Sequence, residues 1–224
     1  MLGDSAETKW RISGSHGGCA GHLQLGIRRS TPVVCRDEQP TQLVKETRQP
    51  LPGRRGTPKR YDFEYERNGM ANSFLFTEPL AGWRKVSVRE TKTKKDWATE
   101  VKSLLDDDYP DAELVILVCD NLNTHTFGAL YDTFDPEEAK RLADRLDIRR
   151  TPKHGSWLNM AEIELSAMTR QCLPRRIPDV ATLRSETNRW AARRNRNQTG
   201  INWQFKTGKA RTKLKSLYPQ ILTT

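Results

Sequence analysis

Three acidic side chains stand where a metal-dependent phosphodiester reaction would need them. Asp37 follows the run PVVCR, Asp120 ends the apolar run LVILVC, and Glu162 lies near the start of an amphipathic segment. Two Mg²⁺ ions about 3.5–4 Å apart cleave phosphodiesters when hard, negatively charged oxygen ligands hold them. This chemistry needs no protein nucleophile, and the sequence offers no convincing Ser/His/Asp or Cys/His arrangement. The pattern therefore favours metal-assisted cutting of nucleic acid.

Two of these acids have a competing neighbour. Glu38 follows Asp37 directly, and side chains alternate between the faces of a strand, so only one of the two faces the site. Glu164 lies two residues beyond Glu162, a rotation of about 200° on a helix, so those two also exclude each other. Spacing alone leaves both choices open. It also allows Asp120 to be a mere strand-end cap.

Two predicted strands carry the two aspartates of this site. Apolar runs predict one strand at 32–38, with Asp37 at its end, and another at 114–120, so apolar that helices should cover both faces. Alternating residues predict three more strands, at residues 61–66, 72–79 and 83–91. Tight turns, the first at Asn68-Gly69, should join them into an antiparallel meander. A short strand is also expected at 148–151.

Helices are predicted where apolar residues recur every three or four positions. Asp96, Asp135 and Asp179 are expected to cap three of them, and Ser156 a fourth that begins near Trp157 and carries Glu162. This order of elements predicts an α/β fold, a mixed sheet with helices on both faces.

Charge and composition point to a polyanionic partner. The 224-residue chain carries a net charge of +10, which favours nucleic acid, although a merely soluble basic protein fits the charge equally well. Residues 47–60 form a predicted loop with five basic residues, suited to phosphate contacts. No apolar run reaches the roughly eighteen residues of a membrane span, and no signal peptide is visible. Cys35 and Cys119 are expected to be buried thiols in a reducing cytoplasm.

Three sequence blocks resemble the catalytic blocks of mariner-superfamily transposases, in particular their bacterial insertion-sequence branch: PVVCRDEQP, LVCDNLNTH and TPKHGSWLNMAEIE. The later KLKSLYP is similar too, so the resemblance covers roughly residues 32–220. It implies a ribonuclease-H-like fold, two Mg²⁺ or Mn²⁺ ions on a DDE triad at Asp37, Asp120 and Glu162, and cutting and rejoining of transposon ends and target DNA. It also implies a possible homodimer that acts at the nucleoid.

Residues around the triad are candidates for DNA contact. His125 and the two asparagines after Asp120 are expected either to orient the Asp120 loop or to contact DNA. His125 is a less favoured Mg²⁺ ligand than a carboxylate. Trp157 is better suited to core packing, and an arginine run is more often a solvated face than a phosphate grip. The DNA-binding residues expected are Asn121, Asn123, His125, Lys153, His154, Arg193 and Arg194.

The expected organisation is an irregular segment at 1–31, a ribonuclease-H-like DDE catalytic domain at 32–200 and a tail at 201–224. Full-length members of the resembled family carry helix-turn-helix domains ahead of the catalytic domain, and residues 1–31 fit none, so a truncated copy is expected. Two alternatives stay open: a DNA-binding remnant that no longer cuts, and another ribonuclease-H-like nuclease, such as a junction resolvase.

Overall fold

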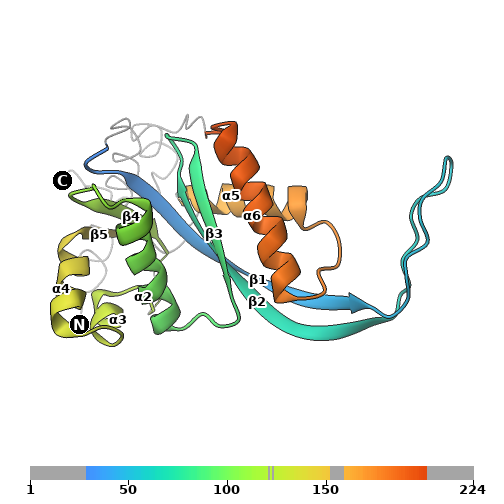
Figure 1. Ribbon diagram of the computed structural model, residues 1–224, viewed down its shortest axis with the longest axis horizontal. Coiled ribbons are helices and arrows are strands. Elements are labelled where there is room, and N and C mark those ends of the chain that lie inside the picture. The colour runs from blue at the N-terminus through green and yellow to red at the C-terminus, as the bar shows by residue number, and fades with distance from the viewer. Residues whose placement is uncertain (1–28, 121, 123, 152–158, 201–224) are drawn as a thin grey trace, which may run out of the picture.

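A single mixed sheet organises the chain (Figure 1). The computed structural model describes residues 29–200, except 121, 123 and 152–158. The strands lie in the order β3-β2-β1-β4-β5, with β1–β2–β3 antiparallel and β4 and β5 parallel to β1. Their bounds are β1 Val33–Glu46, β2 Tyr65–Glu78, β3 Trp83–Arg89, β4 Val115–Cys119 and β5 Leu146–Arg150. The predicted combination of an antiparallel meander with parallel strands is confirmed.

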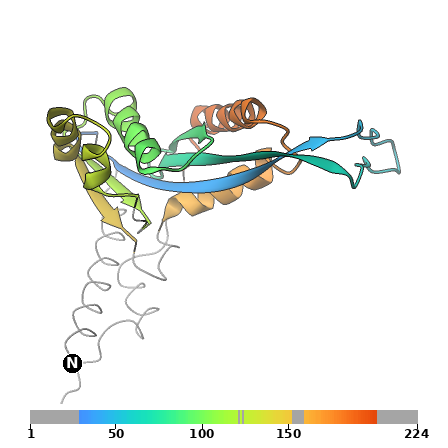
Figure 2. The same cartoon turned by 90° about the horizontal axis from the view of Figure 1, so that it is seen from below.

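Helices cover both faces of this sheet, as predicted, and Figure 2 shows α2 on one side of the strands and α5 on the other. Within the described residues the helices are α2 Lys94–Ser103, a π-helical turn η1 Leu104–Asp108, α3 Phe127–Tyr131, α4 Pro136–Asp144, α5 Met160–Cys172 and α6 Val180–Arg196. None of these helices is long and apolar enough to cross a membrane.

Strand alternation sorts the core into two layers. Val34 of β1 packs with Phe74 and Trp97 under α2, whereas Cys35 packs with Leu75 and residues of α5 and α6. Because neighbouring side chains point to opposite faces, Asp37 belongs to the face that α5 covers. Arg36 and Glu38 belong to the α2 face. Cys35 and Cys119 are buried free thiols, as predicted.

The predicted hairpin at Asn68-Gly69 is wrong. β2 runs unbroken from Tyr65 to Glu78, so two of the predicted strands are one, and the meander consists of β1, β2 and β3. Gly69 adopts a φ of 85°, and the register to β1 shifts between Gln42 and Val44. The left-handed glycine therefore serves a β-bulge inside the strand, where the same residue pair would otherwise make a turn.

β1 is also longer than predicted, so Asp37 lies within the strand and not at its end. Pairing to β4 stops at Cys35, while pairing to β2 continues to Glu46. Beyond Cys35 no described strand pairs with the other edge of β1, and such an edge is where a sheet tolerates a proline such as Pro40.

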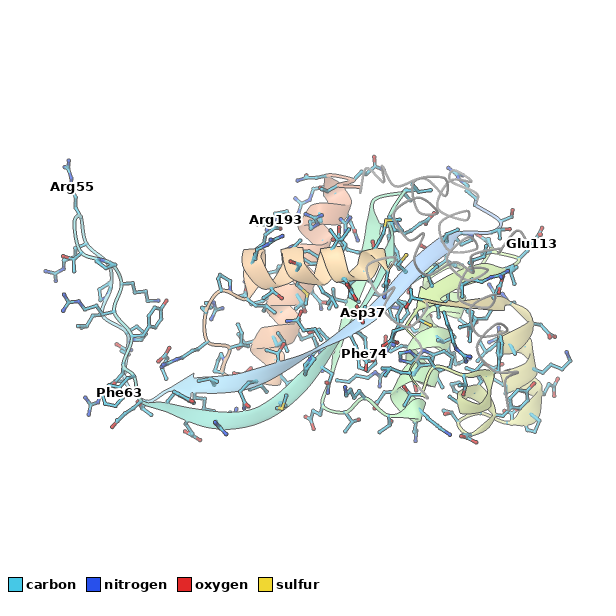
Figure 3. All side chains as sticks on the ribbon, turned by 180° about the vertical axis from the view of Figure 1, so that it is seen from behind. Asp37, Arg55, Phe63, Phe74, Glu113 and Arg193 are labelled. Carbon is cyan, nitrogen blue, oxygen red and sulfur yellow. The ribbon has the colours of Figure 1, made fainter. Side chains whose placement is uncertain are left out.

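The connection from β1 to β2 is an arm that projects from the body (Figures 1 and 3). Backbone bridges pair Leu51 with Arg60 and Arg54 with Thr57 along it. Phe63 near its base is 85% exposed. The arm therefore presents basic and aromatic side chains far from the sheet.

Two of the helices begin at the predicted capping residue, and two begin at a different one. Asp135 and Asp179 cap α4 and α6 as predicted. Asp96, predicted as a cap, instead occupies the third position of α2 and completes a capping box with Thr93. α5 begins at Met160 with Asn159 as its cap, later than the start predicted near Trp157. Ser156 and the segments 1–28 and 201–224 lie outside the described residues.

Candidate active site

Asp37 and Asp120 each lie two residues beyond the last pair between the parallel strands β1 and β4. The pairs run from Val33–Ile116 to Cys35–Val118, and the same offset continued by two residues would align Asp37 with Asp120, the residue directly after β4. Adjacent strands lie about 4.8 Å apart. The sheet therefore brings two acids that are distant in sequence to one place.

Glu162 enters from the first turn of α5. The side chain of Asn159 donates to the carbonyl of Arg36 at 2.9 Å and accepts from the backbone of Ala161 at 3.2 Å. These bonds tie the start of α5 to β1 next to Asp37, which Figure 3 shows beneath that helix. Glu162 is exposed at this position. A carboxylate in the first helical turn is also favoured by the helix dipole.

The charges of Asp120 and Glu162 act on the carboxyl group of Asp37. Burial raises the pKa of Asp37, and the negative charges of Asp120 and Glu162 raise it further, to about 6. A hydrogen bond from the Glu38 amide and the charge of Arg36 oppose this rise. The pKa of Asp37 is therefore raised first by burial and then by the charges of the other two acids.

The donor set suits a hard divalent cation. Within the described part of the chain, no three His, Cys, Asp or Glu side chains are already gathered as a metal-binding group. Carboxylate oxygens are nevertheless what Mg²⁺ and Mn²⁺ prefer. No ion pair to a described basic side chain neutralises Asp37 or Glu162. A cation would relieve the repulsion that raises the pKa of Asp37.

The two competing glutamates are occupied inside the fold. Glu164 is buried, with its carboxylate 3.2 Å from Nε of Arg84 and 2.8 Å from the guanidinium of Arg194. Glu38 lies 2.6 Å from the guanidinium of Arg36. Burial acts to raise the pKa of Glu38, but His125 and Arg36 outweigh it and lower the pKa to about 2. Both glutamates therefore serve the packing of the domain.

His125 anchors the residue at the end of β4. Its Nδ1 lies 2.7 Å from the Asp120 carboxylate, its ring stacks on Trp97 and its Nε2 meets the Arg36 guanidinium. Burial lowers the pKa of His125, yet hydrogen bonds to Asp120, Cys119 and Glu38 prevail and raise it to about 10. The side chain is only 1% exposed. Of the two roles expected for His125, this geometry favours orienting the Asp120 loop over contacting DNA.

Sequence reasoning missed two buried arginines. Arg36 is 1% exposed and lies over the Phe74 ring, and Arg84 is 1% exposed between α5 and α6. The only signal for Arg36 was a basic residue at the end of an apolar run. For Arg84 there was none, because its partner Glu164 lies 80 positions further along the chain.

The remaining predicted DNA-binding residues divide into two groups. Arg193 is exposed on α6, whereas Arg194 turns inward to Glu164. Asn121, Asn123, Lys153 and His154 lie outside the described residues, as does Trp157.

A sheet in the order β3-β2-β1-β4-β5 with helices on both faces is a ribonuclease-H-like fold. Residues 32–184 match the DDE superfamily endonucleases, and the chain belongs to this family. No curated protein sequence matches the chain.

Solved structures of the Mos1 mariner transposase share the fold. The Mos1 strand transfer complex aligns with a TM-score of 0.58 at 13% identity, covering 96% of this chain and 63% of that one. The Mos1 mariner paired end complex with Mn gives 0.56 at 14% identity, with coverages of 97% and 62%. The paired-end complex with the left transposon end gives 0.55 at 15% identity, with coverages of 86% and 56%. This chain thus spans about three fifths of the Mos1 chains.

Proposed function

We propose that the chain is a transposase catalytic domain that cuts DNA at transposon ends and joins the ends to target DNA. The observation that supports the proposal is the parallel pairing of β1 with β4, which ends two residues before Asp37 and Asp120, together with the start of α5, which Asn159 ties to β1 and whose first turn carries Glu162. Membership of the DDE endonucleases supports it. So do the Mos1 structures, which are described as complexes with a transposon end and with Mn or Mg.

Asp37, Asp120 and Glu162 are the residues we assign to two Mg²⁺ or Mn²⁺ ions. Such ions activate an attacking water or 3′-hydroxyl and stabilise the leaving oxygen. The chain's own contribution is to hold the carboxylates in place. β1 fixes Asp37, His125 fixes Asp120 through the 2.7 Å contact, and Asn159 fixes the start of α5.

DNA contact follows from charge and exposure. The net charge of +10 and the five basic residues of the projecting arm supply phosphate contacts. Arg193 is exposed for the same purpose. By resemblance, we also assign DNA contacts beside the triad to Asn121, Asn123, Lys153 and His154. We place the chain in the bacterial insertion-sequence branch, at the nucleoid of the cytoplasm and acting as a homodimer.

The direct test is metal-dependent nicking of supercoiled plasmid DNA. We expect Mg²⁺ or Mn²⁺ to be required, and Asp120→Asn to lower the rate at least about 100-fold, since metal-ligand contacts are worth several kcal/mol in the transition state. The matched control is Asp144→Asn, which changes an exposed acid of α4 that, among the described residues, pairs with Lys140. It should leave nicking unchanged. Equal activity of the wild type and Asp120→Asn would refute the site.

Two other outcomes would replace the proposal. A wild-type chain that binds DNA but never nicks it with either metal would be a DNA-binding remnant. Faster cleavage of RNA–DNA hybrids or four-way junctions than of duplex DNA would indicate a different ribonuclease-H-like nuclease.

A further inference from the structure

A basic groove lies between the end of α5 and the second half of α6. It has a volume of about 720 Å³. Its basic lining comes from two elements: Arg175 from the connection between the helices, and Arg189, Arg193 and Arg196 from α6. One acid, Glu186, also lines it and is 2.7 Å from Arg175.

The three α6 arginines form one continuous stripe. Their spacing of four and three residues places them on a single helix face. All three are exposed, and no ion pair within the described chain engages them. Their neighbour Arg194 instead turns inward to Glu164. Like charges at this spacing repel one another, so an external anion would stabilise the stripe.

The groove lies beside the C-terminal part of α5, the helix whose first turn carries Glu162. In Figure 3, α5 extends from near Asp37 toward Arg193. Glu162 and the groove residue Gln171 are nine positions apart on α5, about 14 Å at 1.5 Å per residue. Exposed Ser166 and Arg170 lie between them.

We infer that the α5–α6 groove binds the phosphate backbone of duplex DNA. Guanidinium groups match phosphate oxygens in a bidentate way. Contacts of this kind position the duplex without reading its sequence. The inference rests on the proposed function, and it assigns DNA contact to Arg175, Arg189 and Arg196 beside Arg193, leaving Arg194 to the interior.

The test is the salt dependence of DNA binding, measured by fluorescence anisotropy with a labelled duplex of arbitrary sequence and with EDTA present to prevent cleavage. The variant replaces all three stripe residues: Arg189→Ser, Arg193→Ser and Arg196→Ser. Each lost phosphate contact should reduce the slope of log K against log salt by about 0.9, so the slope should fall by about 2.7. Affinity at low salt should fall at least about tenfold.

A charge-matched control separates a site from general attraction. Lys94→Ser, Lys95→Ser and Lys140→Ser remove the same charge from exposed positions on α2 and α4, across the sheet from α5 and α6. Replacing the stripe by lysines should restore most of the slope. Glu186→Gln removes the one acid in the groove and should tighten binding about threefold, the effect of one charge roughly 7 Å away in water.

The outcomes distinguish this site from the function on which it rests. If the serine stripe and the control lower the slope equally while wild-type nicking persists, the groove is refuted and the proposed function stands. A wild-type chain that binds no duplex at any salt concentration would overturn both. Thermal unfolding of each variant checks that the fold is intact.

Discussion

The two glutamates of α5 offer the sharpest test of the site, because they are two residues apart and sit in opposite surroundings. Glu162 is exposed at the start of the helix, whereas Glu164 is 1% exposed between two arginines. The same change, Glu to Gln, removes one negative charge at either position. The structure predicts that one variant loses activity and the other loses stability.

The expected loss at Glu164 follows from its contacts. Arg84 is 1% exposed and Arg194 15% exposed, and both guanidinium groups lie within 3.2 Å of the Glu164 carboxylate. Removing one partner of a buried ion pair costs about 3–5 kcal/mol. Because the Gln amide keeps part of the hydrogen bonding, we expect the lower end, about 3 kcal/mol. For a chain of this size that lowers Tm by about 6–12 °C.

At Glu162 we expect a change in stability within about 0.5 kcal/mol, as for other exposed positions. Nicking by Glu162→Gln should fall at least about 100-fold, because a proposed metal ligand is lost. Glu164→Gln should retain nicking at temperatures well below its Tm. Thermal unfolding by circular dichroism and plasmid nicking at 20 °C, each on both variants, complete the comparison.

The reasoning fails if the pattern is reversed. A Glu164→Gln chain with wild-type Tm and no nicking, beside a Glu162→Gln chain that still cuts, would mean that the opposite face of α5 meets the site. Loss of Tm in both variants would mean that Glu162 has a structural partner.

Two further predictions concern the aspartates and their support. The raised pKa of Asp37, about 6, means that the folded chain holds its proton more tightly than the unfolded chain, so stability falls as pH rises from about 4 to 6. Without divalent ions, Asp37→Asn should be more stable than wild type by about 1–3 kcal/mol above pH 6 and equally stable below pH 4, measured by urea unfolding. A difference in stability that stays the same at every pH would contradict this. His125→Phe keeps a ring beside Trp97 but loses the contact with Asp120, so nicking should fall about 10–100-fold. The pKa of His125 is raised to about 10, so protonated His125 stabilises the folded chain fully below pH 6.5, and this stabilisation is lost as pH rises toward 10. Urea unfolding should therefore show the difference in stability between the wild type and His125→Phe becoming smaller over that range.

The sequence predicted the sheet and the helices because their patterns are local. Alternation in β3 and the apolar run of β4 each depend on a few adjacent residues, and the capping acids Asp135 and Asp179 act within one helical turn. Local signals failed where a distant strand decided the outcome. Asn68-Gly69 is a turn sequence, yet pairing with β1 on both sides keeps it inside β2 as a bulge.

The choice between neighbouring acids had the same limit. Periodicity shows that Glu162 and Glu164 point apart, but the partners of Glu164 lie on β3 and α6, far away in the chain. Likewise, nothing local shows that Arg36 is buried against Phe74 and bonded to His125. Such pairs become visible only when the register of the sheet is known.

Those pairs also explain why the chain separates its acids into two kinds. Glu38 and Glu164 each meet an arginine inside the domain, so their charges are balanced by the fold. Asp37 and Glu162 have no such ion pair in the described residues, and burial together with the charges of Asp120 and Glu162 raises the pKa of Asp37. Leaving negative charge unbalanced destabilises a domain, and residues of this kind concentrate where a ligand supplies the balance. If a divalent cation supplies it here, adding Mg²⁺ should stabilise the wild-type chain against urea and leave Asp37→Asn almost unchanged.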